Sequence, residues 1–259
     1  DIGIGTGNLA HHLAARFVKK GHEIIQVIGR SEVPAKALGQ KFFTSHSTDL
    51  KKINRTADIY VICISDSQIE RLASALKLNG KLVLHTSGSI PMKALVKASG
   101  KYGVIYPLQT FSKDAKAKWK NMTLLIEGNA PAVTNEIRAF ASTLCKDVRE
   151  FNSSERLKLH VAAVFVSNFT NHLYTLASEF LEAEKTGHFD LLKPLILETA
   201  KKIKKLSPAQ AQTGPAIRND KNTIEKHLAI LEKYKTHREL YASFTKSILH
   251  SKNKSDGKL

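Results

Sequence analysis

A glycine-rich turn near the start of the chain has the residue types and spacing needed to bind a dinucleotide. It reads Gly-Thr-Gly-Asn-Leu-Ala at residues 5–10, with a short apolar segment before it and a helix-like run from His11 after it. Gly5 permits the tight turn and Gly7 lets the backbone approach the phosphates, while the helix N-terminus offers free N–H groups and a positive dipole end. The strand–turn–helix context strengthens a motif that is weak alone. The residues expected to cradle a pyrophosphate are Gly5, Thr6, Gly7, Asn8 and Leu9.

The end of the second expected strand, residues 23–28, bears on which dinucleotide would bind. Gly29, Arg30 and Ser31 follow this strand, where aspartate or glutamate would bind the ribose 2′-hydroxyl of NAD. An arginine fork and a hydroxyl suit the 2′-phosphate of NADP. We therefore expect Arg30 and Ser31 to favour NADP. The alternative is that Arg30 is one solvated arginine among many in a basic chain.

Polar side chains also follow three further expected strands, at the edge where a parallel sheet meets its ligand. They are Ser65 and Asp66 after the apolar run 57–64, Thr86 and Ser87 after 81–85, and Gln109 after 103–106. We expect the first four to contact the cofactor and Gln109 to contact the substrate. The alternative is that these polar residues form plain turns and helix caps, as Ser67 would if it capped a helix beginning at Gln68.

A long helix, expected from Ser153 or Ser154 to about Lys185, carries the second group of candidate catalytic residues. His160 and Asn168 recur on it at helical spacing and so share one face. Segment 161–166 is almost wholly apolar, so we expect the helix to be buried and its polar side chains to need partners. His160 would then handle a proton and Asn168 would orient a carbonyl or hydroxyl group. In the alternative, both bond backbone groups and fix the angle between domains.

A Gly-Pro break between later helices supplies the last candidate, Arg218. It follows the rigid turn at Gly214-Pro215 and could clamp a substrate carboxylate through a bidentate contact. A loop could also bear such a residue for solubility alone. No arrangement of residues in the sequence predicts a metal site.

Composition bounds the classes of protein to which the chain could belong. With 259 residues, 42% of them hydrophobic, it can form one large domain or two ordinary ones. No apolar run reaches the length of a membrane span, and Cys63 and Cys145 lie in apolar segments, as small buried residues of a reducing compartment do. The net charge of +17 is spread over both halves of the chain, without interleaved aromatic residues, and so argues against nucleic acid as a partner. We expect a cytoplasmic protein whose native chain begins upstream of Asp1.

The order of elements predicts the fold class. Strand and helix patterns alternate over residues 1–152, which indicates an α/β domain with a doubly wound parallel sheet, and only helical patterns follow over residues 153–259. We therefore predict a nucleotide-binding domain joined directly to a helical domain for substrate binding and dimerisation. The expected elements include helices at 34–41, 68–78, 131–144, 189–205, 222–234 and 237–250, a weak strand at Phe42-Phe43, and strands at 123–128 and 148–151.

Together these motifs resemble a bacterial family that joins a Rossmann-like domain to an uncharacterised helical domain, with members described as NADP oxidoreductases. The motifs are residues 5–10, 85–88, 106–111, 162–165 with Asn168 and Asn171, and 213–218 with Thr223-Ile224. The family is similar in plan to pyrroline-5-carboxylate reductase and to the 6-phosphogluconate and 3-hydroxyacid dehydrogenases. The resemblance implies NADP(H) binding, a helical C-terminal domain that builds the active-site cleft, and a homodimer formed through its helices. The catalytic lysine and asparagine of the hydroxyacid dehydrogenases are not matched, because His160 is followed by Val164 in that register.

We therefore expect an oxidoreductase that transfers hydride between NADP(H) and a small polar, anionic compound with a C=O or C=N bond. A rival interpretation is a regulatory protein that binds NADP(H) without catalysis, and a weaker one is a protein drawn to nucleic acid by charge. Rossmann domains host many functions, so the fold alone does not decide among these. The residue that separates the first two is His160, or Tyr106 with Gln109, according to whether it reaches the nicotinamide.

Overall fold

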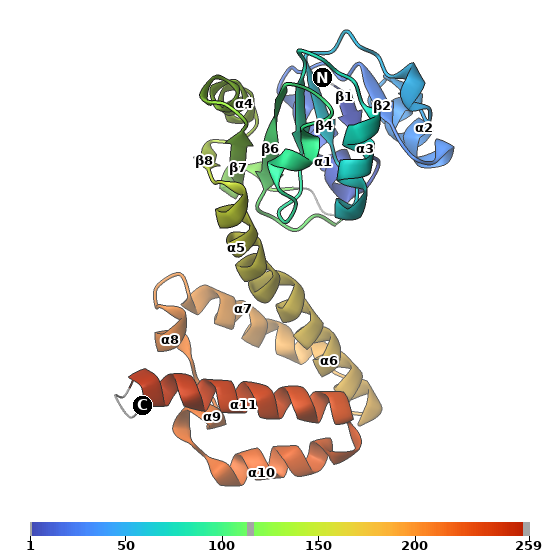
Figure 1. Cartoon of the computed structure of the whole chain (residues 1–259). Helices are drawn as coiled ribbons and strands as arrows, with labels where there is room; N and C mark the ends of the chain where they lie inside the picture. Colours follow the sequence, from blue (N-terminus) through green and yellow to red (C-terminus); the bar gives the residue numbers. More distant parts are fainter. Residues whose placement is uncertain (1, 113–116, 256–259) are drawn as a thin grey trace. The chain divides into compact units, whose positions relative to one another are not determined.

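The computed structural model describes residues 2–112 and 117–255 and divides into two compact units, Asp1–Phe169 and Thr170–Leu259 (Figure 1). The division follows Phe169, whereas the sequence predicted a domain boundary after residue 152, where the last strand has just ended. The first half of the long helix therefore belongs to the first unit. We describe each unit by itself.

The first unit is built on an eight-stranded sheet with the order β3-β2-β1-β4-β5-β6-β7-β8. The strands are β1 (Ile2–Ile4), β2 (Gln26–Ile28), β3 (Ser45–Ser47), β4 (Ile59–Ile62), β5 (Leu82–His85), β6 (Lys101–Pro107), β7 (Thr123–Gly128) and β8 (Asp147–Glu150). All neighbouring strands pair in parallel except β6 and β7, which are antiparallel. The described part of the β6–β7 connection holds one 3-10 turn, Trp119–Asn121, whereas a parallel crossover normally uses a longer helix.

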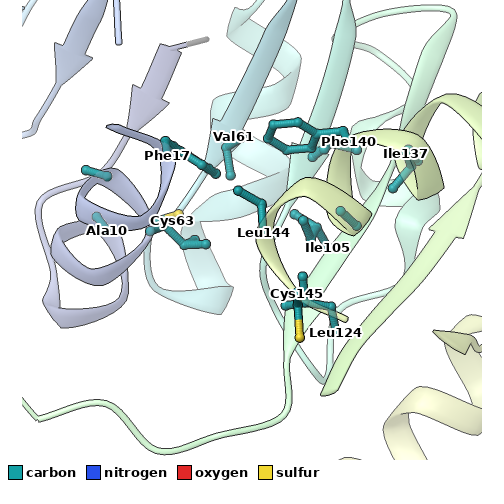
Figure 2. Close-up of a cluster of buried hydrophobic side chains, with 14 of the residues drawn as sticks. Ala10, Phe17, Val61, Cys63, Ile105, Leu124, Ile137, Phe140, Leu144 and Cys145 are labelled. Atoms are coloured by element: carbon teal, nitrogen blue, oxygen red, sulfur yellow. The ribbon is translucent and has the colours of Figure 1, made fainter. Parts of the chain in front are cut away.

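Helices cover both faces of this sheet, so its central strands are buried on both sides. The helices are α1 (Asn8–Lys19), α2 (Glu32–Lys41), α3 (Ile69–Ala75) and α4 (Pro131–Leu144). Residues of α1, α2 and α4 pack in one core cluster, and residues of α3 in another. Figure 2 shows the first cluster, in which the ring centroids of Phe17 and Phe140 lie 5.5 Å apart near Val61. This double burial fixes the strand ends that carry the candidate site.

One strand predicted for the first unit is wrong. Phe42 and Phe43 are not a strand: Phe42 is the C-cap of α2, and Phe43 has a φ of 52° and is 98% exposed, while the edge strand begins at Ser45. The left-handed backbone at Phe43 turns the chain, so the two aromatic residues cannot extend into the sheet.

The long helix also differs from its prediction. Its cap is Asn152, whose side chain accepts the N–H of Glu155 in a capping box, so neither Ser153 nor Ser154 is the cap. α5 (Ser153–Val164) continues into a π turn, Phe165–Phe169, before α6 (Thr170–Ala183) begins, so the regular register expected between residues 160 and 171 is interrupted. The helix is not buried in this chain: Phe165 is 61% and Val166 77% exposed.

The second unit is helical throughout its described residues, 170–255. After α6 come α7 (Lys193–Lys202), α8 (Pro208–Ala211), α9 (Pro215–Arg218), α10 (Lys221–Ile230) and α11 (Lys235–Ser255). Contacts link the end of α6 to the residue before α11: the rings of Phe180 and Tyr234 lie 5.4 Å apart, and the Tyr234 hydroxyl donates to Oε1 of Glu184, just after α6, at 2.6 Å. Among the described residues, no helix combines the length and apolarity that crossing a membrane would demand. Short 3-10 turns elsewhere in the chain cover Leu50–Lys52, Asp66–Gln68, Met92–Leu95, Phe189–Leu192 and Leu231–Lys233.

Candidate active site

A cleft of about 860 Å³ lies at the carboxyl ends of the parallel strands, and all of its lining residues belong to the first unit. This is the edge at which sheets of this plan bind ligands. Most of the residues expected to bind the cofactor line it: Gly5, Thr6, Gly7, Asn8, Leu9, Arg30, Ser65, Asp66, Thr86 and Ser87. His160 lines it as well.

The glycine turn lines the cleft. Its backbone leaves no room for a side chain at Gly5. A Cβ at Gly5 would lie 1.9 Å from the carbonyl oxygen of Cys63, at a φ of 120°. Nothing lies within 4 Å of a Cβ built on Gly7, and Gly7 is the N-cap of α1 without a side-chain cap. The N–H groups of the first turn of α1 thus lack a side-chain cap beside an open space, which suits a pyrophosphate.

The segment after β5 lines the cleft and is held by its own polar groups. The Ser87 N–H donates to His85 Nδ1 at 3.1 Å, and the Ser87 hydroxyl accepts the N–H groups of Ser89 and Ile90 at 3.1 and 3.0 Å. Thr86 Oγ1 donates to the carbonyl oxygen of Ile62 at 3.2 Å. Because Thr86 and Ser87 are engaged in this way, their positions in the cleft are fixed before any ligand binds.

The neutral side chain of His85 holds this segment in place by accepting the N–H of Ser87. It is completely buried, and burial, followed by the nearby charge of Arg156, lowers the pKa of His85 to about 4. Since Nδ1 accepts from Ser87, the proton lies on Nε2. Protonation of Nδ1 would remove the acceptor that orients the Ser87 backbone.

A tyrosine and a histidine that line the cleft contact each other. The Tyr106 hydroxyl lies 3.1 Å from His160 Nδ1, and the two rings meet edge to face with centroids 5.9 Å apart. A Cβ at Gly88 would lie 2.6 Å from His160 Nδ1 and 2.8 Å from Tyr106 Cζ, so only glycine lets both rings approach this backbone. Burial, and secondarily the charge of Asp66, raises the pKa of Tyr106. The phenol therefore holds its proton, and its hydrogen-bond partner is an imidazole.

A buried ion pair anchors the helix that carries His160. Arg156 of α5 is 1% exposed and bonds Glu127 of β7 through Nη1, while its Nη2 donates to the carbonyl oxygen of Ile90 at 2.6 Å. Ser153 Oγ donates to the same carboxylate at 2.7 Å. The start of α5 is thereby tied both to the sheet and to the segment after β5, which fixes His160 relative to Gly88.

Four predicted site residues do not line the cleft. Ser31 caps the start of α2 without a side-chain hydrogen bond, and Gln109 is exposed, with its Oε1 accepting the Thr110 N–H at 2.9 Å. Asn168 lies exposed in the π turn, and Arg218 ends α9 in the second unit. The roles predicted for these four remain predictions.

Other lining residues had not been predicted. Gln68, Arg71, Leu72 and Ala75 line the cleft from α3 and the turn before it, and Thr48 lines it from the segment after β3. The first four recur at the spacing i, i+3, i+4 and i+7, which marks one face of a helix. The sequence shows this spacing, but Gln68 and Arg71 are residue types that usually face solvent on a helix, so the sequence did not indicate a cleft there.

The sheet order, the glycine turn and the position of the cleft define a dinucleotide-binding domain of the Rossmann class. Comparison with known proteins agrees. Residues 2–88 match the family described as "NADP oxidoreductase coenzyme F420-dependent", and residues 122–248 match a "Domain of unknown function (DUF2520)". No match is found among curated proteins.

One solved structure identifies the family of the whole chain. A Bacteroides fragilis protein titled "putative NADP oxidoreductase" is 41% identical, with a TM-score of 0.90, and the match covers 96% of this chain and 97% of that one. The chain belongs to this family of NADP oxidoreductases. Through that membership its cofactor is NADP and its class of reaction is oxidation–reduction.

More distant structures share the fold. A reductive aminase from Aspergillus terreus, in complex with NADPH and ethyl-5-oxohexanoate, is 15% identical with a TM-score of 0.72, over 100% of this chain and 94% of that one. A 1-pyrroline-5-carboxylate reductase from Streptococcus pyogenes is 14% identical with a TM-score of 0.61, over 98% of each chain. The Rossmann-like domain followed by a helical region, as predicted, is confirmed.

Proposed function

We propose that the chain transfers hydride between NADP(H) and a small polar compound with a C=O or C=N bond, and that the reaction takes place in the cleft of the first unit. The observation that carries this proposal is that a single cleft contains both the glycine turn and the Tyr106–His160 pair. A cradle for phosphates and a pair of groups able to move a proton are the two parts that such a reaction requires of the protein. The volume of about 860 Å³ suits a dinucleotide with a small partner.

Different residues of the chain bind the cofactor, transfer the proton and orient the substrate. The N–H groups at the start of α1 and the backbone at Gly7 hold the pyrophosphate, and Arg30 holds the 2′-phosphate. Bound NADP(H) supplies or accepts the hydride. His160 gives the reacting oxygen or nitrogen its proton during reduction, and the Tyr106 hydroxyl at 3.1 Å orients its ring. We further propose that Asn168 and Gln109 orient the substrate and that Arg218 binds its anionic end.

The test uses the full chain, first in binding and then in turnover. Calorimetric titration with NADPH should show saturable binding, and a screen of keto acids, aldehydes and imines should show loss of NADPH absorbance. His160→Gln should lower turnover about 10²- to 10⁴-fold, the range for a removed general acid, without weakening NADPH binding. Lys158→Gln, an exposed change on the same helix, is the matched control.

Two results would contradict the proposal. NADPH binding without turnover of any compound in the screen would favour the regulatory protein weighed above. Full turnover by His160→Gln would remove His160 from the reaction while leaving the enzyme class intact.

We also propose a homodimer that forms through the helix α5, the π turn and α6. Leu157, Val161, Phe165, Val166 and Phe169 are all exposed in the isolated chain, and so many apolar side chains on one helical segment indicate a covered surface. Light scattering at micromolar concentration should report twice the mass of the chain. A monomer at that concentration would exclude the dimer.

We place the protein in a reducing compartment, the cytoplasm, since Cys63 and Cys145 are both free and buried.

A further inference from the structure

Two arginines that line the cleft have no partner among the residues that the structure describes. Arg30 follows β2 and Arg71 lies on α3, and both line the cleft. Neither guanidinium makes an ion pair or hydrogen bond with any residue that the structure describes. Two cations that face the same cavity without a carboxylate leave an uncompensated positive charge there.

The other arginines of the first unit differ in this respect. Each of them has a partner: Arg16 bonds the carbonyl oxygen of Leu144, Arg55 that of Lys77, Arg138 pairs with Glu150, Arg149 with Asp147 and Arg156 with Glu127. The two arginines that line the cleft are therefore the exceptions within the described part of this unit. Arg30 and Arg71 share their position in the lining of the cleft. This position indicates that an anionic ligand neutralises their positive charge.

The acidic side chains nearby do not supply it. Glu32, two residues after Arg30, pairs with His46 at 2.9 Å, and Asp49 accepts the N–H of Lys51. Glu70 precedes Arg71 on α3 but does not line the cleft. Asp66 does line it, but its carboxylate accepts the Ser89 hydroxyl.

Apolar side chains that suit a flat aromatic ring line the same cleft. Ile28 and Leu50 line it from β2 and the turn after β3, and Leu72 and Ala75 line it from α3. Thr48 adds an exposed hydroxyl to the lining. A cleft with apolar side chains, two guanidinium groups and a hydroxyl matches an adenosine that carries an additional phosphate.

We propose that Arg71 acts with Arg30 to bind the adenosine 2′-phosphate of NADP, and that Arg71 is thereby a second determinant of NADP over NAD. A phosphate monoester carries between one and two negative charges near neutral pH, so one arginine does not neutralise it and two do. Thr48 donates a further hydrogen bond to the same group. This inference rests on the proposed position of the cofactor in the cleft, and it assigns a role to a residue outside the glycine turn and the end of β2.

The proposal predicts a selective loss of affinity, which binding alone can measure. In calorimetric titrations of the full chain, Arg71→Gln should weaken NADPH and adenosine 2′,5′-bisphosphate about tenfold or more, as for a lost charge-assisted contact. Binding of NADH and of adenosine 5′-monophosphate should stay within about twofold of the wild type, since neither has the 2′-phosphate. Arg71→Lys, which keeps the charge but loses the planar fork, should fall between the two.

The matched control is Lys77→Gln. Lys77 follows α3, is exposed, and does not line the cleft, so this change removes one nearby positive charge without touching the ligand. It should leave all four affinities within about twofold. Because Arg71 is exposed and has no partner in the described chain, Arg71→Gln should fold, which thermal unfolding checks.

Three outcomes would overturn the inference. Equal weakening of all four ligands would show that Arg71 stacks on the adenine instead, and unchanged affinities would show that it binds nothing. A wild type that binds no nucleotide would overturn the proposed function together with this inference. A wild type that prefers NADPH, combined with an Arg71→Gln variant that keeps this preference, would overturn the inference alone.

Discussion

The two units of the chain differ in how many of their apolar side chains are buried. Nearly all buried hydrophobic side chains belong to the first unit, whereas in the described part of the second unit only Leu176 and Ala216 are buried hydrophobic residues. Leu191, Leu195, Leu197, Ile203 and Leu206 of the second unit are all exposed. Both units contain enough apolar residues for a core, but among the residues that the structure describes only those of the first unit form one.

The two units therefore obtain their stability from different sources. A sheet covered by helices on both faces removes apolar surface from water within one unit, at about 25 cal/mol per Å². Single-layer helices cannot do so, because each helix has a stripe that must be buried against another element. In the homodimer proposed above, a second copy of the chain would cover exposed apolar residues of the second unit as well as those of α5 and the π turn.

The largest expected effect comes from the buried ion pair of the first unit. Arg156→Leu leaves the Glu127 carboxylate buried beside Ser153 without its cation, which typically costs 3–5 kcal/mol of unfolding free energy. Urea titration followed by tryptophan fluorescence should show it, since the single tryptophan, Trp119, lies in this unit. The control Arg138→Leu breaks an exposed pair with Glu150 and should cost no more than about 1 kcal/mol. Equal losses in the two variants would contradict a special role for burial.

Replacing one leucine in each unit compares how much each unit's apolar side chains contribute to the free energy of unfolding. Leu84 of β5 is completely buried, so Leu84→Ala should lower the free energy of unfolding by about 2–5 kcal/mol. Leu195 of α7 is 63% exposed, so Leu195→Ala should change it by no more than about 0.5 kcal/mol at protein concentrations where the chain is monomeric. Circular dichroism during urea titration follows both variants. A large, concentration-independent loss in Leu195→Ala would show that the second unit has a core of its own.

Burial in the first unit also predicts a dependence on pH. Because the pKa of His85 falls from 6.5 in the unfolded chain to about 4 in the fold, the folded state binds fewer protons between these values. The stabilisation is complete above pH 6.5 and declines as the pH falls to about 4, by about 3 kcal/mol in total. His85→Asn, whose Oδ1 can still accept the Ser87 N–H, should flatten this part of the profile.

The profile of the variant is compared with that of His188→Asn, an exposed histidine of the second unit. This control should keep the decline between pH 6.5 and 4. If His85→Asn keeps it too, groups other than His85 are responsible for the acid sensitivity.

The comparison also explains which features could be predicted from the sequence. The helix over residues 131–144 and the strand over 123–128 match α4 and β7 residue for residue, because a short apolar run that ends at Gly128 marks the strand and Pro131 marks the first turn of the helix. The glycine turn was readable for a related reason: its spacing is set by backbone geometry within a few residues. Such local signals describe the first unit well.

Features that depend on distant contacts were not readable. The Tyr106–His160 pair joins residues 54 positions apart, and its closeness depends on Gly88, which looked like an ordinary turn glycine. The burial expected for the long helix was wrong for this chain, because periodicity shows that a face is apolar but not what covers it. Arg71 was overlooked because an arginine on a helix usually faces solvent.

The smallest expected effect tests whether the cofactor specificity belongs to the first unit alone. Arg30 lines the cleft, so Arg30→Asp should weaken NADPH binding about tenfold or more, which corresponds to the 1.5–3 kcal/mol of a charge-assisted contact. An aspartate can accept a ribose hydroxyl, so NADH affinity should hold or improve and the preference should reverse. Calorimetric titration of both cofactors measures this, with Lys36→Gln as the control, since Lys36 is exposed on α2 and does not line the cleft. Equal affinities of the wild type for NADPH and NADH would refute the assignment of Arg30. A preference that survives Arg30→Asp but disappears in Arg71→Gln would move the specificity from the end of β2 to α3, still within the first unit.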